Sequence, residues 1–211
     1  MSRTGGAPAT KTFLGLAVGL WLLSMLGMRG QLYELFAQAN VLVASGEWWR
    51  IFTPVLVHAD GFTHILFNMW ALWVLGPQIE RGVGSWPFVG LYLASAGAGG
   101  AFMYVLGGLD APFAVGASGA IFGLFGVWLN WAIRRRNTAQ GRFLLRQIGF
   151  LLLLNAALPF IIRSIAWEAH LGGLIAGFVI GELWSRARND TARVAVAVAI
   201  AALAVVAVLV L

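Results

Sequence analysis

The stretch Gly116-Ala117-Ser118-Gly119 opens a long apolar segment, and the interpretation of the whole chain depends on it. Taken alone, a serine among glycines in a membrane helix is typical of helix packing. Small residues let helices approach closely in lipid, and a serine hydroxyl can bond to its own turn. Two other segments change that interpretation, His64-Ile65-Leu66-Phe67-Asn68 and Ala169-His170-Leu171-Gly172-Gly173. A serine, a histidine base and two further polar side chains, each just inside an apolar segment, are the components of a nucleophilic site.

The composition predicts an integral membrane protein. Hydrophobic residues make up 60% of the 211 residues and charged residues 10%, and several apolar runs reach the roughly 20 residues that cross a bilayer. Of the ten tryptophans, several lie near segment ends, where amphipathic rings sit among lipid headgroups. The chain has no cysteine, which excludes disulfides, thiolate catalysis and cysteine-based metal sites.

Seven segments are predicted to be membrane helices, which makes the chain an all-α, polytopic bundle. The first resembles a signal peptide but lacks an Ala-x-Ala-like exit, so we interpret it as a spanning helix. Asp60, Ser85 and Ser164 are predicted to open later helices. The predicted helices cover residues 12–28, 61–80, 85–107, 114–133, 145–162, 165–184 and 194–211.

The segments between the helices define the expected organisation. Residues 1–11 are predicted to be a short cytoplasmic tail, and residues 12–184 a six-helix core. Within this core, residues 29–60 interleave polar and aromatic side chains without a run long enough to span, which predicts a structured amphipathic loop at the interface. Residues 185–211 are a basic linker and a seventh transmembrane helix. No polar linker is long enough to separate two bundles, so one domain is expected.

Lysine and arginine predict the orientation. With seven spans, eleven basic residues fall on the side of the N-terminus, and three fall on the other side: Arg29, Arg50 and Arg163. The positive-inside rule then predicts a cytoplasmic N-terminus and an external C-terminus, in a bacterial inner membrane. This distribution also accounts for the net charge of +6 without a nucleic-acid partner. The eleven are Arg3, Lys11, Arg81, Arg134, Arg135, Arg136, Arg142, Arg146, Arg186, Arg188 and Arg193.

The polar residues share one depth in this topology. The helices that carry His64 and Asn68, Ser118, and His170 all enter from the outer side. At 1.5 Å per residue, the four side chains are expected roughly 5–12 Å below the outer surface. His64 and Asn68 are four residues apart, so they lie on one helix face.

Glycines accompany Ser118 and His170 along their helices. Each glycine alone is more typical of packing than of function. Two such faces together allow the close helix approach that a short serine side chain needs to reach an imidazole. The glycines are Gly119, Gly123 and Gly126 beside Ser118, and Gly173, Gly177 and Gly181 at three, seven and eleven residues after His170.

The remaining polar residues do not extend the site. His58 is predicted to be a solvated or structural histidine in the interfacial loop. The three histidines lack the carboxylate and second-shell pattern of a zinc site, so no metal or organic cofactor is expected. Glu168 is two residues from His170 and points elsewhere on a helix. No aspartate is placed to complete a triad, so Ser118 and His170 would form a dyad.

Four pieces of the chain occur in an order and spacing that resemble rhomboid intramembrane serine proteases. The resemblance covers about residues 12–184. It implies a six-helix core with Ser118 as nucleophile and His170 as base, and the seventh helix resembles the six-plus-one arrangement of the family. It also implies an aromatic residue under the histidine ring, here Phe122. The four pieces are Glu47-Trp48-Trp49-Arg50-Ile51-Phe52-Thr53, His64-x-x-x-Asn68, Gly116-x-Ser118-Gly119, and Ala169-His170 followed by Gly173 and Gly177.

The expected activity is therefore proteolysis of transmembrane protein substrates within the lipid bilayer. The Ser118 backbone N–H and, as the resemblance implies, the His64 and Asn68 side chains would hold the oxyanion. An alternative is a catalytically silent relative that binds or escorts membrane helices; such proteins would be expected to lose the serine or the histidine. A small transporter would need ionisable residues at the midplane, whereas this cluster lies near one surface. The sequence does not indicate an oligomeric state.

Overall fold

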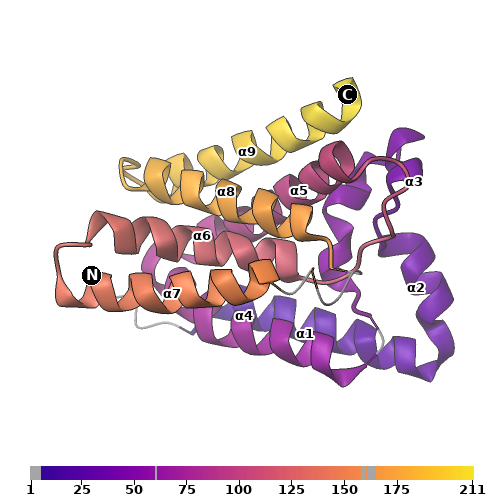
Figure 1. Cartoon of the computed structure of the whole chain (residues 1–211), viewed down its shortest axis with the longest axis horizontal. Coiled ribbons are helices and arrows are strands. Elements are labelled where there is room, and N and C mark those ends of the chain that lie inside the picture. The colour runs from indigo at the N-terminus through magenta and orange to yellow at the C-terminus, as the bar shows by residue number, and fades with distance from the viewer. Residues whose placement is uncertain (1–5, 60, 158–159, 161–164) are drawn as a thin grey trace.

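The protein is a bundle of helices (Figure 1). The computed structural model describes residues 6–59, 61–157, 160 and 165–211. In this part of the chain all named elements are helical, which confirms the predicted all-α membrane bundle and its additional C-terminal helix. The long helices are α1 (Pro8–Leu23), α4 (Phe62–Val83), α5 (Ser85–Gly107), α6 (Ser118–Arg134), α7 (Ala139–Ala157), α8 (Trp167–Trp184) and α9 (Asp190–Val210).

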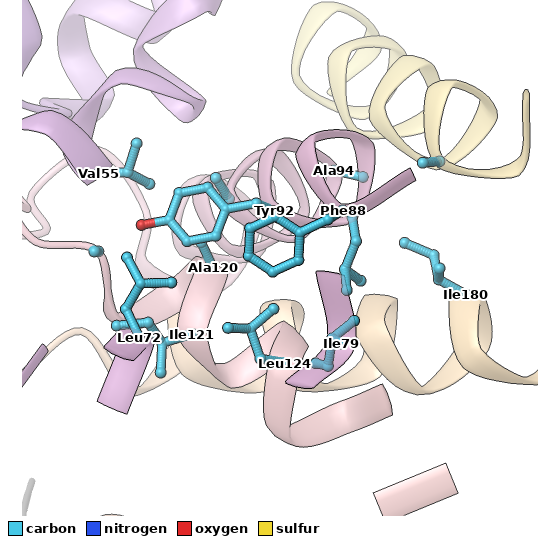
Figure 2. Packing of buried hydrophobic residues seen from close by; sticks show 14 of the residues in the cluster. Val55, Leu72, Ile79, Phe88, Tyr92, Ala94, Ala120, Ile121, Leu124 and Ile180 are labelled. Atoms are coloured by element: carbon cyan, nitrogen blue, oxygen red, sulfur yellow. The ribbon is translucent and has the colours of Figure 1, made fainter. Parts of the chain in front are cut away.

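Helices α5, α6 and α8 form the centre of the bundle, and each packs against the other two. Helix α9 packs on α5 along one edge, α1 and α4 lie side by side along the opposite edge, and α7 packs against α6 (Figure 1). The core between them is apolar (Figure 2). Its fully buried side chains include Leu72 of α4, Phe88 and Tyr92 of α5, Leu124 of α6 and Ile180 of α8.

Helix α6 begins at Ser118, later than the predicted residue 114. Gly116 has φ +122°, a conformation that side-chain-bearing residues rarely adopt and that no right-handed helix contains. Ala114 instead pairs in an isolated β-bridge with Gln38, through N–H···O bonds of 3.0 and 2.8 Å. Ser118 is therefore the first residue of its helix and not a residue in its interior.

Helix α1 begins at Pro8, within the segment expected to be a tail. Proline has no backbone N–H, and it suits the first turn of a helix because the N–H groups of that turn have no intrahelical acceptor. The N–H groups of Ala9 and Thr10 are satisfied by the Glu80 carboxylate of α4, at 2.9 and 2.8 Å. At its other end, α1 leads into a kink over Ser24–Met28, where Gly27 has the non-helical φ of +98°.

Other boundaries differ for identifiable reasons. Helix α4 passes through Gly82 and ends at Val83, because Gly84 has φ +93°. Ser85 follows this Gly84 N-cap as the first residue of α5. Helix α7 starts before the predicted residue 145 and α9 before residue 194, where the Asn189 side chain accepts a bond from the Ala192 N–H. The predicted caps Asp60 and Ser164, and the end of the helix expected over 145–162, lie outside the described residues.

The segment expected to be an interfacial loop is structured. It contains α2 (Arg29–Phe36), α3 (Asn40–Ala44) and two 3₁₀ turns, Trp48–Ile51 and Thr53–Leu56. Arg50 is buried, and its guanidinium donates to the Ala37 and Glu34 carbonyls and to the Glu47 carboxylate, at 2.8, 2.6 and 2.7 Å. Trp49 is exposed. A single arginine therefore joins three parts of this segment.

Length and composition alone select three helical segments of the described chain as able to cross a bilayer: Pro8–Phe36, Ser85–Gly107 and Asp190–Val210. Two of the four other long helices, α4 and α7, have apolar outer surfaces. Trp70 and Trp73 on α4 and Phe150 and Leu153 on α7 are each more than half exposed. Large apolar side chains in that position are expected where a helix faces lipid.

Candidate active site

The structure brings Ser118 and His170 into direct contact. Ser118 opens α6, and His170 lies in the first turn of α8. The Ser118 Oγ and the His170 Nε2 are 2.8 Å apart, within hydrogen-bond distance. Both residues are partly buried, so a reactant can reach them. This is the geometry that a histidine needs to take the proton of a serine nucleophile.

Bare backbone brings α6 and α8 close enough for this contact. A Cβ atom on Gly173 would overlap the Gly119 carbonyl oxygen, and one on Gly177 would overlap the Gly123 carbonyl oxygen. The two helices therefore touch backbone to backbone along the predicted glycine faces. Because the short serine side chain reaches only a close neighbour, this packing determines whether the pair can form.

Phe122 fixes the plane of the histidine ring. It lies one helical turn after Ser118, and its ring stacks on that of His170 with centroids 4.2 Å apart and an angle of 7° between the planes. A ring held face to face cannot tilt without losing this contact. The His170 Nε2 therefore stays directed at Ser118.

His64 presents a hydrogen-bond donor to the segment before Ser118. Its Nδ1 accepts a bond from the Ala59 N–H at 3.3 Å, so the neutral ring carries its proton on Nε2. A Cβ atom on Gly116 would lie 2.8 Å from that Nε2, so only a glycine fits there. The left-handed conformation of Gly116 and this contact together explain the glycine at this position.

Asn68 lies one turn further along the same face of α4. It is buried, and its Nδ2 donates to the His64 carbonyl oxygen at 2.9 Å. An amide nitrogen carries two hydrogens, and the second has no partner among the described residues. His64 and Asn68 thus each retain one N–H donor on the helix face that was predicted.

The sequence did not decide whether His58 is a solvated or a structural histidine. It is buried, its Nε2 accepts a bond from the Ala117 N–H at 3.4 Å, and its carbonyl oxygen accepts one from the Tyr33 hydroxyl at 2.9 Å. Burial and then the neighbouring His64 lower the pKa of His58 to about 3, so the ring is neutral. The interpretation as a structural histidine is confirmed and the solvated alternative is wrong.

A second hydrogen bond holds the segment before Ser118. The Gly116 N–H donates to the Pro54 carbonyl oxygen at 2.9 Å. Together with the bond from Ala117 to His58, it fastens both residues before Ser118 to the loop that precedes α4. The sequence contained no signal for these contacts, because neither loop has a periodic pattern.

The described residues do not offer a metal site or a catalytic triad. No three of their histidine and acidic side chains gather closely enough to hold a metal ion. The His58 and His64 rings are neighbours, with centroids 5.4 Å apart, but no described carboxylate joins them. Among the described residues no carboxylate bonds to His170 either, Glu168 included. The chemistry available is that of a serine and a neutral imidazole.

The sequence did not predict a polar cluster that lies at the opposite end of the same helix pair. The Glu182 carboxylate of α8 accepts bonds from the Asn130 amide and the Arg134 guanidinium of α6, at 3.2 and 2.9 Å, and from Arg186 at 3.0 Å. Asn130 is buried. We call these four residues the Glu182 clamp. Asn130 follows Ser118 by twelve positions, and Glu182 follows His170 by twelve.

Comparison with known proteins identifies relatives over most of the chain. The Rhomboid domain family model matches residues 45–187. The chain is 39% identical to the protein YdcA of Bacillus subtilis (strain 168), over 83% of this chain and 88% of YdcA. It is 36% identical to the rhomboid protease GluP of that organism, over 80% of this chain and 34% of GluP. It is 37% identical to rhomboid-like protease 1 of Toxoplasma gondii, over 71% of this chain and 51% of that protein.

The chain therefore spans most of YdcA but about a third of GluP and half of the Toxoplasma protein. The matched domain extends from the loop before α4 to the end of α8, and so includes Ser118, His170, His64 and Asn68. Its apolar helices make it an integral membrane protein. The extent of the domain match and the identity to YdcA show that this chain belongs to the rhomboid family.

Proposed function

We propose that the chain is an intramembrane serine endopeptidase that uses Ser118 as nucleophile and His170 as general base. The observation that carries the proposal is the 2.8 Å contact between the Ser118 Oγ and the His170 Nε2. The named rhomboid proteases among its relatives support the reaction class. A silent relative would not need a serine and a histidine held at hydrogen-bond distance.

The reaction follows from the two side chains. The neutral His170 Nε2 removes the Ser118 proton as the oxygen attacks a peptide carbonyl carbon. The imidazolium then gives this proton to the leaving amine as the C–N bond breaks, and an ester to Ser118 remains. A water molecule, deprotonated by the same imidazole, hydrolyses the ester and restores the free serine.

We assign the stabilisation of the oxyanion to three donors, the Ser118 backbone N–H, the His64 Nε2–H and the free N–H of Asn68. Such donors each contribute about 2.7–4 kcal/mol to transition-state stabilisation in serine hydrolases. Gly116 serves this arrangement by letting the His64 ring approach the backbone just before the nucleophile.

The position of the dyad determines where a substrate is cut. Ser118 and His170 lie at the first residues of α6 and α8, at the end that the distribution of arginines assigns to the outer side. The scissile bond would therefore lie near the outer end of a transmembrane substrate. A regular helix shields its own peptide bonds, so the substrate must unwind locally. Glycine and proline ease this, because they cost a helix about 1 and 3 kcal/mol relative to alanine.

The test is cleavage of a panel of single-span substrates by the purified, reconstituted protein, with the products mapped by mass spectrometry. Small, helix-breaking and bulky residues are placed along both halves of the span, and Ser118→Ala serves as the control. We expect cuts in the outer half, after small residues, and none with the control. Cuts in the cytoplasmic half would contradict the proposed geometry, and cleavage by Ser118→Ala would contradict the assigned nucleophile.

A further inference from the structure

The turn between α6 and α7 gathers arginines without acidic partners. Residues 134–147 include five arginines and no aspartate or glutamate. Arg134 belongs to the Glu182 clamp, whose carboxylate is already shared with Asn130 and Arg186. Within the described chain no acidic side chain pairs with the other four, all of which are exposed. These four, here named the four-arginine surface, are Arg135, Arg136, Arg142 and Arg146.

The backbone of the turn holds them together. The Arg135 carbonyl oxygen accepts bonds from the Thr138 N–H and hydroxyl at 2.9 and 2.8 Å, and the Thr138 oxygen accepts one from the Gly141 N–H at 3.0 Å. A Cβ atom on Gly141 would overlap the Arg135 carbonyl group, so the first turn of α7 lies directly on Arg135. Arg142 follows at once, and its guanidinium donates to the Asn137 carbonyl oxygen at 3.1 Å.

Without a bound anion, the positions of these arginines destabilise α7. Arg142 and Arg146 are four residues apart on one exposed face of the helix, and like charges at that spacing repel. Arg142 lies in the first turn of α7, where the helix dipole disfavours cations, and that turn has no acidic residue. An anion bound between the guanidinium groups would relieve both costs.

The tryptophan beside this surface indicates a location among the lipid headgroups. The Arg135 guanidinium lies over the Trp131 ring, 4.4 Å from its centroid. Tryptophan rings are enriched at the membrane–water interface, and arginine forms paired hydrogen bonds with phosphate. Helix α7 continues from here into an apolar run with exposed Phe150 and Leu153, the side chains that lipid tails would cover.

We propose that the four-arginine surface binds the phosphate groups of anionic phospholipids in the adjoining leaflet. The lipid tails would lie against the apolar surface of α7 while the headgroup contacts the arginines. Each basic side chain near an anionic membrane surface strengthens binding roughly fivefold. This surface is separate from the chemistry at Ser118 and does not rest on it.

Native mass spectrometry of the detergent-purified protein tests the proposal. The protein is titrated with short-chain phosphatidylglycerol, with phosphatidylcholine of the same chain length and with inorganic phosphate. We expect phosphatidylglycerol to bind most strongly, because only it combines the anion with an apolar tail. Equal binding of the two lipids, or phosphate binding as strong as phosphatidylglycerol binding, would overturn the proposal. Tighter binding of a DNA or RNA oligomer to the same arginines would overturn it in favour of a nucleic-acid surface.

Two triple variants distinguish lipid binding by this surface from a general effect of the protein's net charge. Arg136→Gln with Arg142→Gln and Arg146→Gln should weaken phosphatidylglycerol binding about a hundredfold, from three fivefold steps. Lys11→Gln with Arg81→Gln and Arg188→Gln removes the same charge from exposed residues predicted on the same side, and should leave the affinity nearly unchanged. Equal losses in the two variants would show that only net charge matters. Gly141→Ala keeps every charge but displaces α7 from Arg135, so its binding should also weaken; unchanged binding would overturn the assignment to this turn.

Discussion

The helix pair α6–α8 has a polar contact at each end, and the two contacts differ in how completely their groups are satisfied. At the Ser118 end, the Ser118 hydroxyl and the His170 ring bond to each other. At the Glu182 end, the Glu182 carboxylate accepts bonds from three side chains. Both ends are held by the same glycine packing. The difference indicates a division of roles, since a saturated carboxylate is suited to fixing helix register and a lone serine–histidine contact leaves its atoms available for reaction.

The largest effect is expected from the contact at the Ser118 end. Ser118→Ala and His170→Ala should each lower turnover at least about a thousandfold, because they remove the proposed nucleophile or the proposed base. The thermal midpoint should change little, since Ser118 is partly exposed and alanine suits a helix. Rates are measured on a reconstituted single-span substrate, with melting curves alongside. Full activity in a folded Ser118→Ala protein would refute the dyad.

The next largest effect is expected from the two side chains proposed as oxyanion donors. His64→Ala and Asn68→Ala should each reduce kcat by about 10²–10³ with little change in KM, because the oxyanion exists only in the transition state. Steady-state kinetics on one substrate separate the two constants. A large rise in KM at constant kcat would assign these side chains to substrate binding instead.

A change in the glycine packing between the two ends should have a nearly equal effect on activity. Gly177→Ala inserts a methyl group against the Gly123 backbone and should separate α6 from α8, costing about 1–3 kcal/mol of stability and much of the activity. Gly149→Ala is the matched control, because a Cβ atom there meets no atom within 4 Å. If both variants melt and cleave alike, close backbone packing does not position the dyad.

Loss of the contact at the Glu182 end should have a smaller effect. Glu182→Ala leaves the buried Asn130 amide without its partner, which should lower the thermal midpoint by about 2–4 °C. Glu182→Gln retains an acceptor for Asn130 and should recover part of the loss. Turnover should fall less than in Gly177→Ala. A fall in turnover as large as that of His170→Ala, with an unchanged midpoint, would contradict a role in register alone.

The smallest effect is a pH dependence at His58. Its folded pKa of about 3 lies below the ordinary 6.5, so below pH 6.5 the unfolded chain binds a proton that the folded chain does not. The free energy of unfolding should therefore decrease as the pH is lowered from 6.5 toward 3, by at most about 1.4 kcal/mol per pH unit for this group. His58→Gln removes this contribution, so its unfolding curves between pH 6.5 and 5.5 should shift less than those of the unchanged protein. Parallel shifts would show that His58 does not titrate as stated.

The sequence predicted the parts of the molecule that depend on periodicity. Ser118 and His170 were expected together because both begin apolar segments entering from one side and both are followed by glycines on one helix face. Contacts between loops or across distant turns were not predicted. The bond from Ala117 to His58, the capping of α1 by Glu80 and the Glu182 clamp each join residues whose approach depends on the finished packing. The late start of α6 was missed because residues 114–117 are apolar enough to continue the helix, and only the conformation of Gly116 shows otherwise.

The most direct measurement of the central claim is covalent labelling with a fluorophosphonate, which reacts with a serine activated by a neighbouring base. The purified protein is treated with the reagent, and the modified residue is identified by peptide mass spectrometry. The proposed dyad predicts a single adduct on Ser118, absent from Ser118→Ala and strongly reduced in His170→Ala. Labelling of another serine, or undiminished labelling of Ser118 in a folded His170→Ala protein, would contradict it.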